Sequence, residues 1–217
     1  MSQKARQNAS DRNRQPEVLI FAENKNDSDA IKCLAESLNP SMRVRLVVQR
    51  DPTSLTRHAQ ERAVRSWIDR IAGAVHARTR LATVVGVLVH QDSDGPDPDG
   101  RVAKALGEKL NALLKTTSHP VVPVQETESW WFLYPDAFRS VNRIAWKGLK
   151  LPSKQDTDGI ISPKERLIRL TRPTKRTYAE ADSLAVAQQM ADAVRRGESP
   201  LNHSASWSRF VALARSL

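Results

Sequence analysis

Six consecutive residues, Val84 to Val89, place the strongest constraint on how this 217-residue chain can fold. They form an apolar run without polar alternation, so both faces of the segment are expected to be buried, as in the central strand of a parallel sheet. The run is far too short to cross a membrane, and we expect no membrane contact. Because parallel strands are joined by crossover connections, usually helices, the run predicts an α/β fold.

Strand-like and helix-like segments alternate around this run. Short apolar segments predict strands, and segments with apolar residues at helical spacing predict helices. The predicted strands are 18–22, 44–48, 84–89 and 121–124, and the predicted helices between them are 30–38, 53–80 and 101–114. We therefore predict a mostly parallel central sheet of about four strands flanked by helices. Right-handed crossovers would place the carboxyl ends of all strands at one edge, where open α/β sheets form their sites.

Composition divides the chain into three parts. Residues 1–15 are polar and basic and cannot bury enough apolar surface to offset the entropy of ordering, so we expect a disordered basic arm. Residues 16–146 carry the predicted α/β core. Residues 147–217 begin with a loop and continue as a helical extension packed on the core, with helices predicted at 163–170, 178–195 and 206–217.

The chain is strongly basic. Its 34 Lys and Arg residues outnumber its 24 Asp and Glu residues, which gives a formal net charge of +10. This charge favours a polyanionic partner, with nucleic acid as the first candidate. A single cysteine, Cys33, excludes an intramolecular disulfide and a multi-cysteine zinc site, and it fits a reducing compartment. Because the first fifteen residues lack the apolar core of a signal peptide, we expect a cytoplasmic protein.

Two acidic residues, Asp92 and Asp94, follow the buried run closely. Two carboxylates two residues apart just past a strand can point toward one hard cation, and oxygen ligands suit Mg²⁺ or Mn²⁺. Crowded acidic residues repel one another unless a cation or a basic substrate neutralises them. The alternative is a solvated turn, since Asp and Gly are also common turn residues.

Glu23 and Asp27 follow the first predicted strand. A carboxylate at this position could act as a base or bind a metal ion. The alternative for Asp27, and the preferred interpretation for Asp29, is that the side chain caps the following helix. Glu23 would project from the same sheet edge as Asp92, so its position favours a site.

Glu128 follows the fourth predicted strand and brings a further acidic group to that edge. It could be a third metal ligand or the partner of a nearby arginine. Two adjacent tryptophans, Trp130 and Trp131, come directly afterwards, and such pairs are more typical of core packing than of base stacking.

Several common catalytic motifs do not occur in the sequence. It holds no Gly-x-x-x-x-Gly-Lys, no Gly-x-Gly-x-x-Gly and no Gly-x-Ser-x-Gly, which removes support for phosphate-loop ATPases, dinucleotide enzymes and serine hydrolases. Its five histidines show no metal-ligand spacing. His90, beside Asp92, is the one to consider further, and a structural role is expected for it.

The order of the acidic motifs along the chain resembles that of the Toprim-like families. Glu23 follows the first strand, Asp92-x-Asp94 follows the central strand and Glu128-x-Trp130 follows the fourth. The chain is similar to a family of small stand-alone Toprim-like proteins of unknown function, which is distantly similar to the nuclease domain of overcoming-lysogenization-defect (OLD) proteins. The resemblance covers residues 17–217 and implies a Toprim/Rossmann-like fold. Its later features are Asp136-Ala137, Pro163-Lys164-Glu165, Tyr178, Ser206-Trp207 and Phe210.

The resemblance implies roles for the acidic residues. In Toprim enzymes the glutamate after the first strand is implicated as general acid or base, which gives that role to Glu23. The Asp-x-Asp pair binds Mg²⁺ during phosphodiester cleavage or synthesis, which gives metal binding to Asp92 and Asp94. In the OLD group a further acid helps to hold metal, and Asp27 matches its place. Glu128 is carried over as the acid of the Glu-x-Trp segment.

One position departs from the family. Asn24 stands where relatives usually have Gly. Glycine permits a tight turn and close backbone approach, and Asn can replace it in left-handed conformations.

These observations predict a metal-dependent nuclease that uses Mg²⁺ or Mn²⁺ and acts on nucleic acid, with DNA favoured over RNA. The alternative is a non-catalytic nucleic-acid- or partner-binding module, and a nucleotidyl transferase ranks last. The resemblance also suggests phage defence and a separately encoded partner ATPase. A basic run that could grip phosphates, or could be a solvated helix face, comprises Lys164, Arg166, Arg169, Arg172, Lys175 and Arg176.

Overall fold

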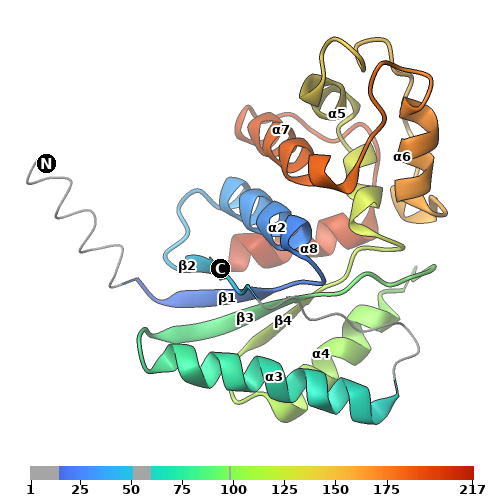
Figure 1. Ribbon diagram of the computed structural model, residues 1–217. Helices are drawn as coiled ribbons and strands as arrows, with labels where there is room; N and C mark the ends of the chain where they lie inside the picture. The colour runs from blue at the N-terminus through green and yellow to red at the C-terminus, as the bar shows by residue number, and fades with distance from the viewer. Residues whose placement is uncertain (1–14, 51–59, 98) are drawn as a thin grey trace, which may run out of the picture.

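Four parallel strands form the centre of the protein, in a computed structural model that describes residues 15–50, 60–97 and 99–217. The strands lie in the order β2-β1-β3-β4, with bounds β1 Glu17–Phe21, β2 Arg45–Val48, β3 Val84–His90 and β4 Ser118–Val121 (Figure 1). The predicted α/β fold with a parallel sheet is confirmed. The predicted disordered arm lies outside the described residues apart from Gln15, and the first part of the predicted helix at 53–80 lies outside them too.

The two central strands are buried on both faces. β1 contributes Val18 and Ile20 to one hydrophobic core and Leu19 and Phe21 to the other. This division follows from the strand itself, because successive side chains point to opposite faces of a sheet. β3 divides in the same way, which is the two-sided burial that its unbroken apolar run predicted.

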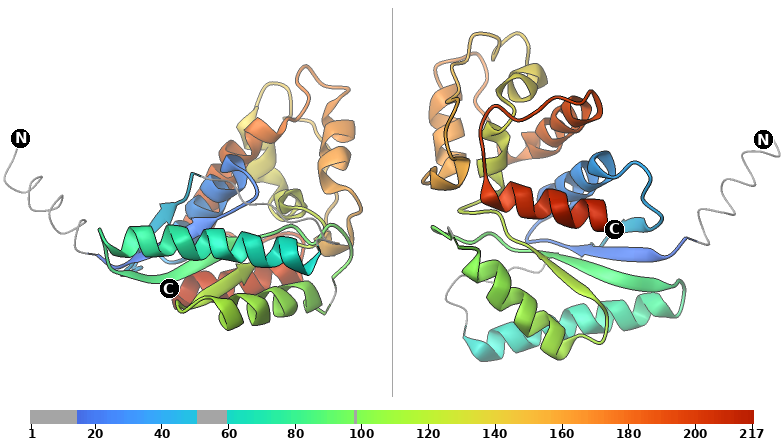
Figure 2. Two further views of the ribbon diagram at one scale, coloured as in Figure 1. Left: turned by 60° about the horizontal axis from the view of Figure 1, so that its bottom comes forward. Right: turned by 180° about the vertical axis from the view of Figure 1, so that it is seen from behind.

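Helices cover both faces of the sheet (Figures 1 and 2). On one side lie α2 (Lys25–Leu38), α7 (Ser183–Arg195) and α8 (Ala205–Ser216), and on the other lie α3 (Glu61–Thr79) and α4 (Arg101–Leu113). α7 packs against α2, so it forms an outer layer over that helix. Among the helices in the described part of the chain, none is long and apolar enough to span a membrane.

Shorter elements connect β4 to the last two helices. They are η1 (Thr127–Phe132), α5 (Pro135–Val141), η2 (Thr157–Gly159), α6 (Pro163–Thr171) and η3 (Glu180–Asp182). Most of the predicted loop after residue 147 is irregular, with η2 as a single short turn within it.

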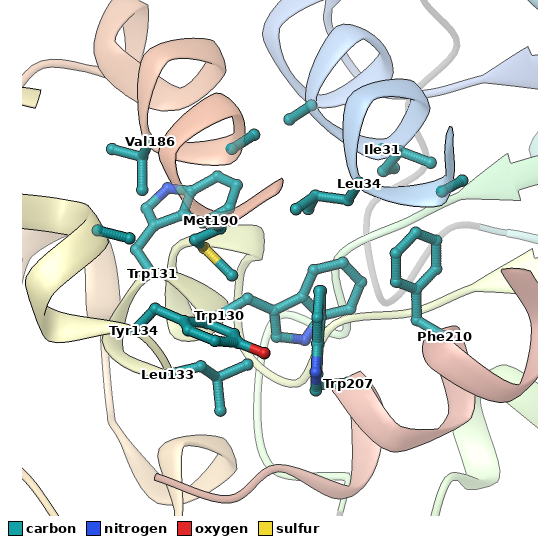
Figure 3. Close-up of a cluster of buried hydrophobic side chains, with 14 of the residues drawn as sticks. Ile31, Leu34, Trp130, Trp131, Leu133, Tyr134, Val186, Met190, Trp207 and Phe210 are labelled. Atoms are coloured by element: carbon teal, nitrogen blue, oxygen red, sulfur yellow. The ribbon is translucent and has the colours of Figure 1, made fainter. Parts of the chain in front are cut away.

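An aromatic cluster joins this carboxy-terminal part to the core (Figure 3). Trp130 is fully buried, stacks on Phe210 with 5.0 Å between ring centroids, and meets Trp207 edge-on at 5.4 Å. Its indole Nε1 donates a hydrogen bond to Ser206 Oγ at 2.9 Å. Trp131 is also fully buried, so both adjacent tryptophans belong to the core, as their pattern predicted.

The fourth strand lies earlier in the chain than predicted. The apolar segment at 121–124 suggested the strand, but the ladder with β3 runs over Ser118–Val121, and His90 pairs with Val121. Val122 and Val124 are buried beyond the end of this ladder. An apolar run indicates which residues are buried. The bounds of a strand depend instead on where its hydrogen-bonded neighbour, here β3, ends. Pro120 is tolerated because β4 is an edge strand.

Two helices begin elsewhere than predicted. α2 begins at Lys25 rather than at residue 30, because Asn24 caps it. The helix predicted at 178–195 begins only at Ser183, since the residues just before it form the 3₁₀ turn η3. At α2 the polar residues around the helix start mark the cap, whereas apolar periodicity alone misplaces the boundary. α7 begins without a side-chain cap.

Candidate functional site

Glu23 and Asp92 lie side by side at the carboxyl edge of the sheet. Each follows its strand by two residues, Glu23 after β1 and Asp92 after β3, and these strands are hydrogen-bonded neighbours. The backbone N–H of Asp92 donates to Glu23 Oε1 at 3.4 Å. The parallel arrangement of β1 and β3 therefore brings the two predicted acidic turns together.

The Asp92 carboxylate is oriented from η1. Its Oδ1 accepts hydrogen bonds from the backbone N–H of Thr127 at 3.0 Å and from the Thr127 hydroxyl at 3.2 Å. Imidazole Nε2 of His90 lies 3.3 Å from the same oxygen and 2.9 Å from Thr127 Oγ1. Thr127 and His90 thus hold the carboxylate through one oxygen atom.

Asp27 joins this cluster from the first turn of α2. Asn24 is the helix cap: its Oδ1 accepts from the Asp27 backbone N–H at 3.0 Å, and its Nδ2 donates to Asp27 Oδ2 at 2.7 Å. The alternative in which Asp27 or Asp29 caps the helix is therefore wrong. Asn24 has an extended backbone with φ −146°, so the position needs no left-handed conformation, and the capping bond explains an asparagine there.

Glu128 adds a buried carboxylate from η1. Its Oε1 accepts a hydrogen bond from the Tyr178 hydroxyl at 3.3 Å. The basic residue that acts on its charge is Lys164 rather than an arginine. Lys164 Nζ also donates to Glu180 Oε2 at 2.7 Å, so the amino-terminal turn of α6 borders the cluster.

Burial raises the pKa of the three carboxyl groups that surround Asp92. The pKa is raised to about 7 for Glu23, to about 6 for Asp27 and to about 8 for Glu128. The negative charge of Asp92 raises each of these pKa values further, and the charge of His90 lowers those of Glu23 and Asp27. Negative charge at this edge is therefore only partly neutralised by basic residues.

Glu17, at the amino-terminal end of β1, is a buried carboxylate that is neutralised by basic side chains, unlike those around Asp92. It is fully buried, yet Arg78 donates to it at 2.6 and 2.7 Å and Arg45 forms a second ion pair with it. The hydrogen bond from Arg78 and the contact with Arg45 hold the pKa of this glutamate below its ordinary value. Two arginines thus stabilise one structural carboxylate here, whereas Glu23, Asp27 and Glu128 form no ion pair with an arginine of the described residues.

His90 is the main group of the cluster whose role the sequence did not reveal. It is 1% exposed, and burial alone would lower its pKa, but the bond to Asp92 and the charges of Asp27 and Glu23 outweigh this and raise the pKa to about 9. A charged imidazole offsets part of the surrounding negative charge. The available signal was its position between a buried strand and Asp92.

Asp94 lies at the rim of the cluster rather than inside it. It is exposed, its backbone is left-handed with φ 50°, and its N–H donates to the Gln125 carbonyl at 3.1 Å. Its charge is the smallest of the causes that act on the pKa of Glu23. Of the predicted Asp92 and Asp94 pair, the structure places Asp92 in the cluster and Asp94 at its margin.

The predicted basic run separates in the structure. Lys164 reaches the acidic cluster, and its pKa is raised because the bond to Glu180 and the charges of Glu128 and Glu126 outweigh its burial. Arg176 instead pairs with Asp182 and lies 5.9 Å from the centroid of the Trp146 ring, which indicates a structural contact. The other members are exposed or half-buried and form no ion pair within the described residues: Arg166, Arg169, Arg172 and Lys175.

The segment after β4 also positions α6. Glu126 Oε2 accepts a hydrogen bond from the Lys164 backbone N–H at 3.0 Å. Thr127, the next residue, holds Asp92, and Glu128 enters the cluster. Glu126 and Thr127 carried no sequence signal of their own, because their roles depend on which strand end lies opposite them.

The carboxylates are not arranged as a finished metal site. Across residues 15–50, 60–97 and 99–217, no three His, Cys, Asp or Glu side chains are placed to hold one metal ion as they lie. What the geometry provides is a set of oxygen donors, Glu23, Asp27, Asp92 and Glu128, at one edge of the sheet with mutually repelling charges.

These pKa shifts predict that the protein loses stability as the pH rises. Because the folded-state pKa values of Glu23, Asp27 and Glu128 lie above the ordinary values of 4.5, 3.8 and 4.5, the folded chain binds more protons than the unfolded chain from about pH 4 to pH 8. His90 acts in the same direction, since its stabilising contribution is lost as the pH rises through its pKa of about 9. We expect a loss of several kcal/mol between pH 5.5 and 8.5 in EDTA.

Differential scanning calorimetry at several pH values measures this effect. The melting temperature should fall steadily from pH 5.5 to 8.5, and Asp92→Asn should flatten the profile because it removes a charge that raises all three pKa values. A melting temperature that is constant or higher at pH 8.5 would contradict the described electrostatics.

Comparisons with known proteins returned no match. No protein-family model, no curated protein and no solved structure matches this chain.

Proposed function

We propose that this protein is a metal-dependent nuclease that cleaves phosphodiester bonds in nucleic acid, with a Toprim-like arrangement of acidic residues. The observation that carries the proposal is the convergence of Glu23, Asp27, Asp92 and Glu128 at the carboxyl edge of the sheet, three of them with raised pKa values. Such perturbed groups are typical of functional sites. The net charge of +10 on the whole chain favours a polyanionic substrate.

The donor set fits a hard divalent cation. All four side chains offer carboxylate oxygens, which suit Mg²⁺ and Mn²⁺. A divalent cation would also relieve the repulsion that raises the pKa values of Glu23, Asp27 and Glu128. The proposal requires carboxylate side chains to rotate inward, and Asp92, held through Oδ1 by Thr127 and His90, would be the fixed point of the set.

Each residue then has a defined task. When bound, the metal ion would polarise the phosphate and make a water molecule a better nucleophile. Glu23, with a pKa of about 7, suits proton transfer near neutral pH. Asp92, Asp27 and Glu128 would supply metal ligands, with Asp94 at the rim as a further oxygen donor. Lys164 is the cation of the cluster best placed to offset phosphate charge.

A cleavage assay tests the proposal. Purified protein is incubated with supercoiled plasmid, single-stranded DNA and RNA, each in Mg²⁺, Mn²⁺ or EDTA. We expect metal-dependent cleavage that EDTA abolishes and that Glu23→Gln removes, with DNA cleaved in preference to RNA. Salt-sensitive binding without turnover in either metal would contradict the proposal and favour a non-catalytic nucleic-acid-binding module.

A further inference from the structure

A hollow lies at the outer edge of the sheet, beside β4. Its volume is about 290 Å³, and residues of α4, β4 and α8 line it. α4 and α8 lie on opposite faces of the sheet (Figure 2). Pro120, Val121 and Phe210 give it an apolar floor, while Lys104 from α4 and Arg209 from α8 supply two cations. The nuclease proposal does not use any of these residues.

One nitrogen of the Arg209 guanidinium lacks a hydrogen-bond partner among the described residues. Its Nη2 is buried and forms no hydrogen bond with any described residue, and no carboxylate of the described chain forms an ion pair with it. Asp97, which precedes α4, accepts from the Val102 backbone N–H through Oδ1 at 3.2 Å. Its buried Oδ2 forms no hydrogen bond among the described residues, and no ion pair joins it to Arg209. A guanidinium has five N–H donors and no acceptor, so leaving one buried and unbonded costs free energy unless an external group accepts it.

Gly100 lets the guanidinium approach the backbone. A Cβ atom at this position would lie 3.1 Å from both Cζ and Nη1 of Arg209, closer than side chains normally pack. Gly100 also has φ +66°, a left-handed conformation that favours glycine. The guanidinium thus lies against the backbone of a glycine. Lys104 also lines the hollow, is exposed and forms no ion pair among the described residues.

We infer that this hollow binds a backbone phosphate of a nucleic-acid strand, with Arg209 and Lys104 as its cationic ligands. Arginine suits phosphate because its planar donors can form two parallel hydrogen bonds. The apolar floor would face the sugar or base of the same nucleotide. The inference rests on the proposed function for its substrate class and adds a second contact to it.

The position of the hollow supports this assignment. β4 is hydrogen-bonded to β3, and Asp92 follows the end of β3. Val122, which lines the hollow, precedes Glu128 of the acidic cluster by six residues. A nucleic-acid strand that reaches from the hollow to the acidic cluster would therefore run along the carboxyl edge of the sheet. Positive charge in the hollow would hold the backbone, and the acidic cluster would receive another phosphate of the same strand.

Binding measured without metal tests the inference separately from cleavage. Fluorescence anisotropy follows a labelled oligonucleotide, single-stranded or duplex, in EDTA over a series of salt concentrations. We expect Arg209→Met to weaken binding roughly tenfold and Lys104→Met to weaken it less. The double variant should lower the slope of log affinity against log salt by about 1 to 2, because one or two phosphate contacts are lost.

Matched variants distinguish loss of the Arg209 contact from a general loss of positive charge and from loss of folding. Arg215→Met removes an exposed arginine from the last turn of the same helix and should bind like the wild type, while Arg209→Lys should recover part of the affinity. Circular dichroism and melting temperature check that each variant folds. Inorganic phosphate and a mononucleotide are titrated in parallel, and the inference expects neither to bind tightly without the rest of the strand.

The outcomes distinguish this inference from the nuclease proposal. Reduced affinity and salt slope in the Arg209 and Lys104 variants would support the hollow even if the wild type never cleaves. Unchanged affinity and slope in a folded double variant would overturn it even if the wild type is a nuclease. Absence of nucleic-acid binding by the wild type, or tight binding of the free mononucleotide alone, would also overturn it.

Discussion

Replacing Asp92 by asparagine should abolish metal-dependent cleavage, with a loss of about 1,000-fold or more, and should not lower the melting temperature. The first effect follows because an amide cannot supply the charge that a divalent ion requires, and a 1,000-fold loss corresponds to about 4 kcal/mol of transition-state stabilisation. The second follows because asparagine Oδ1 can still accept from Thr127 and from His90 Nε2, while one of several repelling charges disappears. Loss of cleavage without a lower melting temperature would therefore distinguish an active-site carboxylate from a structural one.

The control for this variant is Asp99→Asn. Asp99 is an exposed aspartate seven residues further on, paired with Arg101 at 3.1 Å and outside the cluster. The Asp99→Asn protein should keep the full cleavage activity of the wild type. A folded Asp92→Asn protein that cleaves like the wild type would remove Asp92 from the proposed site.

Trp130→Ala should have the largest effect on folding. Trp130 is fully buried, stacks on Phe210, meets Trp207 edge-on and donates to Ser206 (Figure 3). Removing the indole leaves a cavity among these side chains, which typically costs about 3–5 kcal/mol for a buried tryptophan. Urea denaturation followed by circular dichroism measures the free energy of unfolding.

A conservative variant tests the cause of that loss. Trp130→Phe keeps an aromatic ring but removes the N–H that bonds to Ser206, so a smaller loss of about 1–2 kcal/mol is expected from the lost bond and reduced volume. If Trp130→Ala unfolds at the same urea concentration as the wild type, the aromatic cluster does not hold the carboxy-terminal part on the core.

Much of the fold could be predicted because its central strands have unambiguous patterns. The unbroken apolar run at 84–89 predicted a strand buried on both faces, and β3 has that burial through most of its length. β4 was misplaced because its ladder uses Ser118 and His119, which carry no apolar signal, and this choice depends on where β3 ends. The start of α2 was missed because Asn24 caps it through a side-chain bond that apolar periodicity does not register.

The candidate site could be predicted in part for a similar reason. Residues that directly follow parallel strands must share an edge, so the proximity of Glu23 and Asp92 could be deduced from the order of elements. The charge of His90 and the hydrogen bonds from Thr127 to Asp92 could not be predicted from the sequence, because they depend on side chains that meet only after folding. Arg209 is further removed, since its hollow forms only where α4 and α8 meet at the edge of β4.

Binding of Mn²⁺ to the wild-type protein, followed by isothermal titration calorimetry at pH 6.5 in two buffers of different ionisation enthalpy, tests most directly whether the acidic cluster is a metal site. Because Glu23 and Glu128 have pKa values of about 7 and 8, they are largely protonated at this pH, and a metal ion must displace those protons. We predict a saturable isotherm with net proton release, with an affinity that Asp92→Asn weakens at least tenfold and Asp99→Asn leaves unchanged. An isotherm without binding heat in either buffer, or one that Asp92→Asn leaves unaltered, would contradict it.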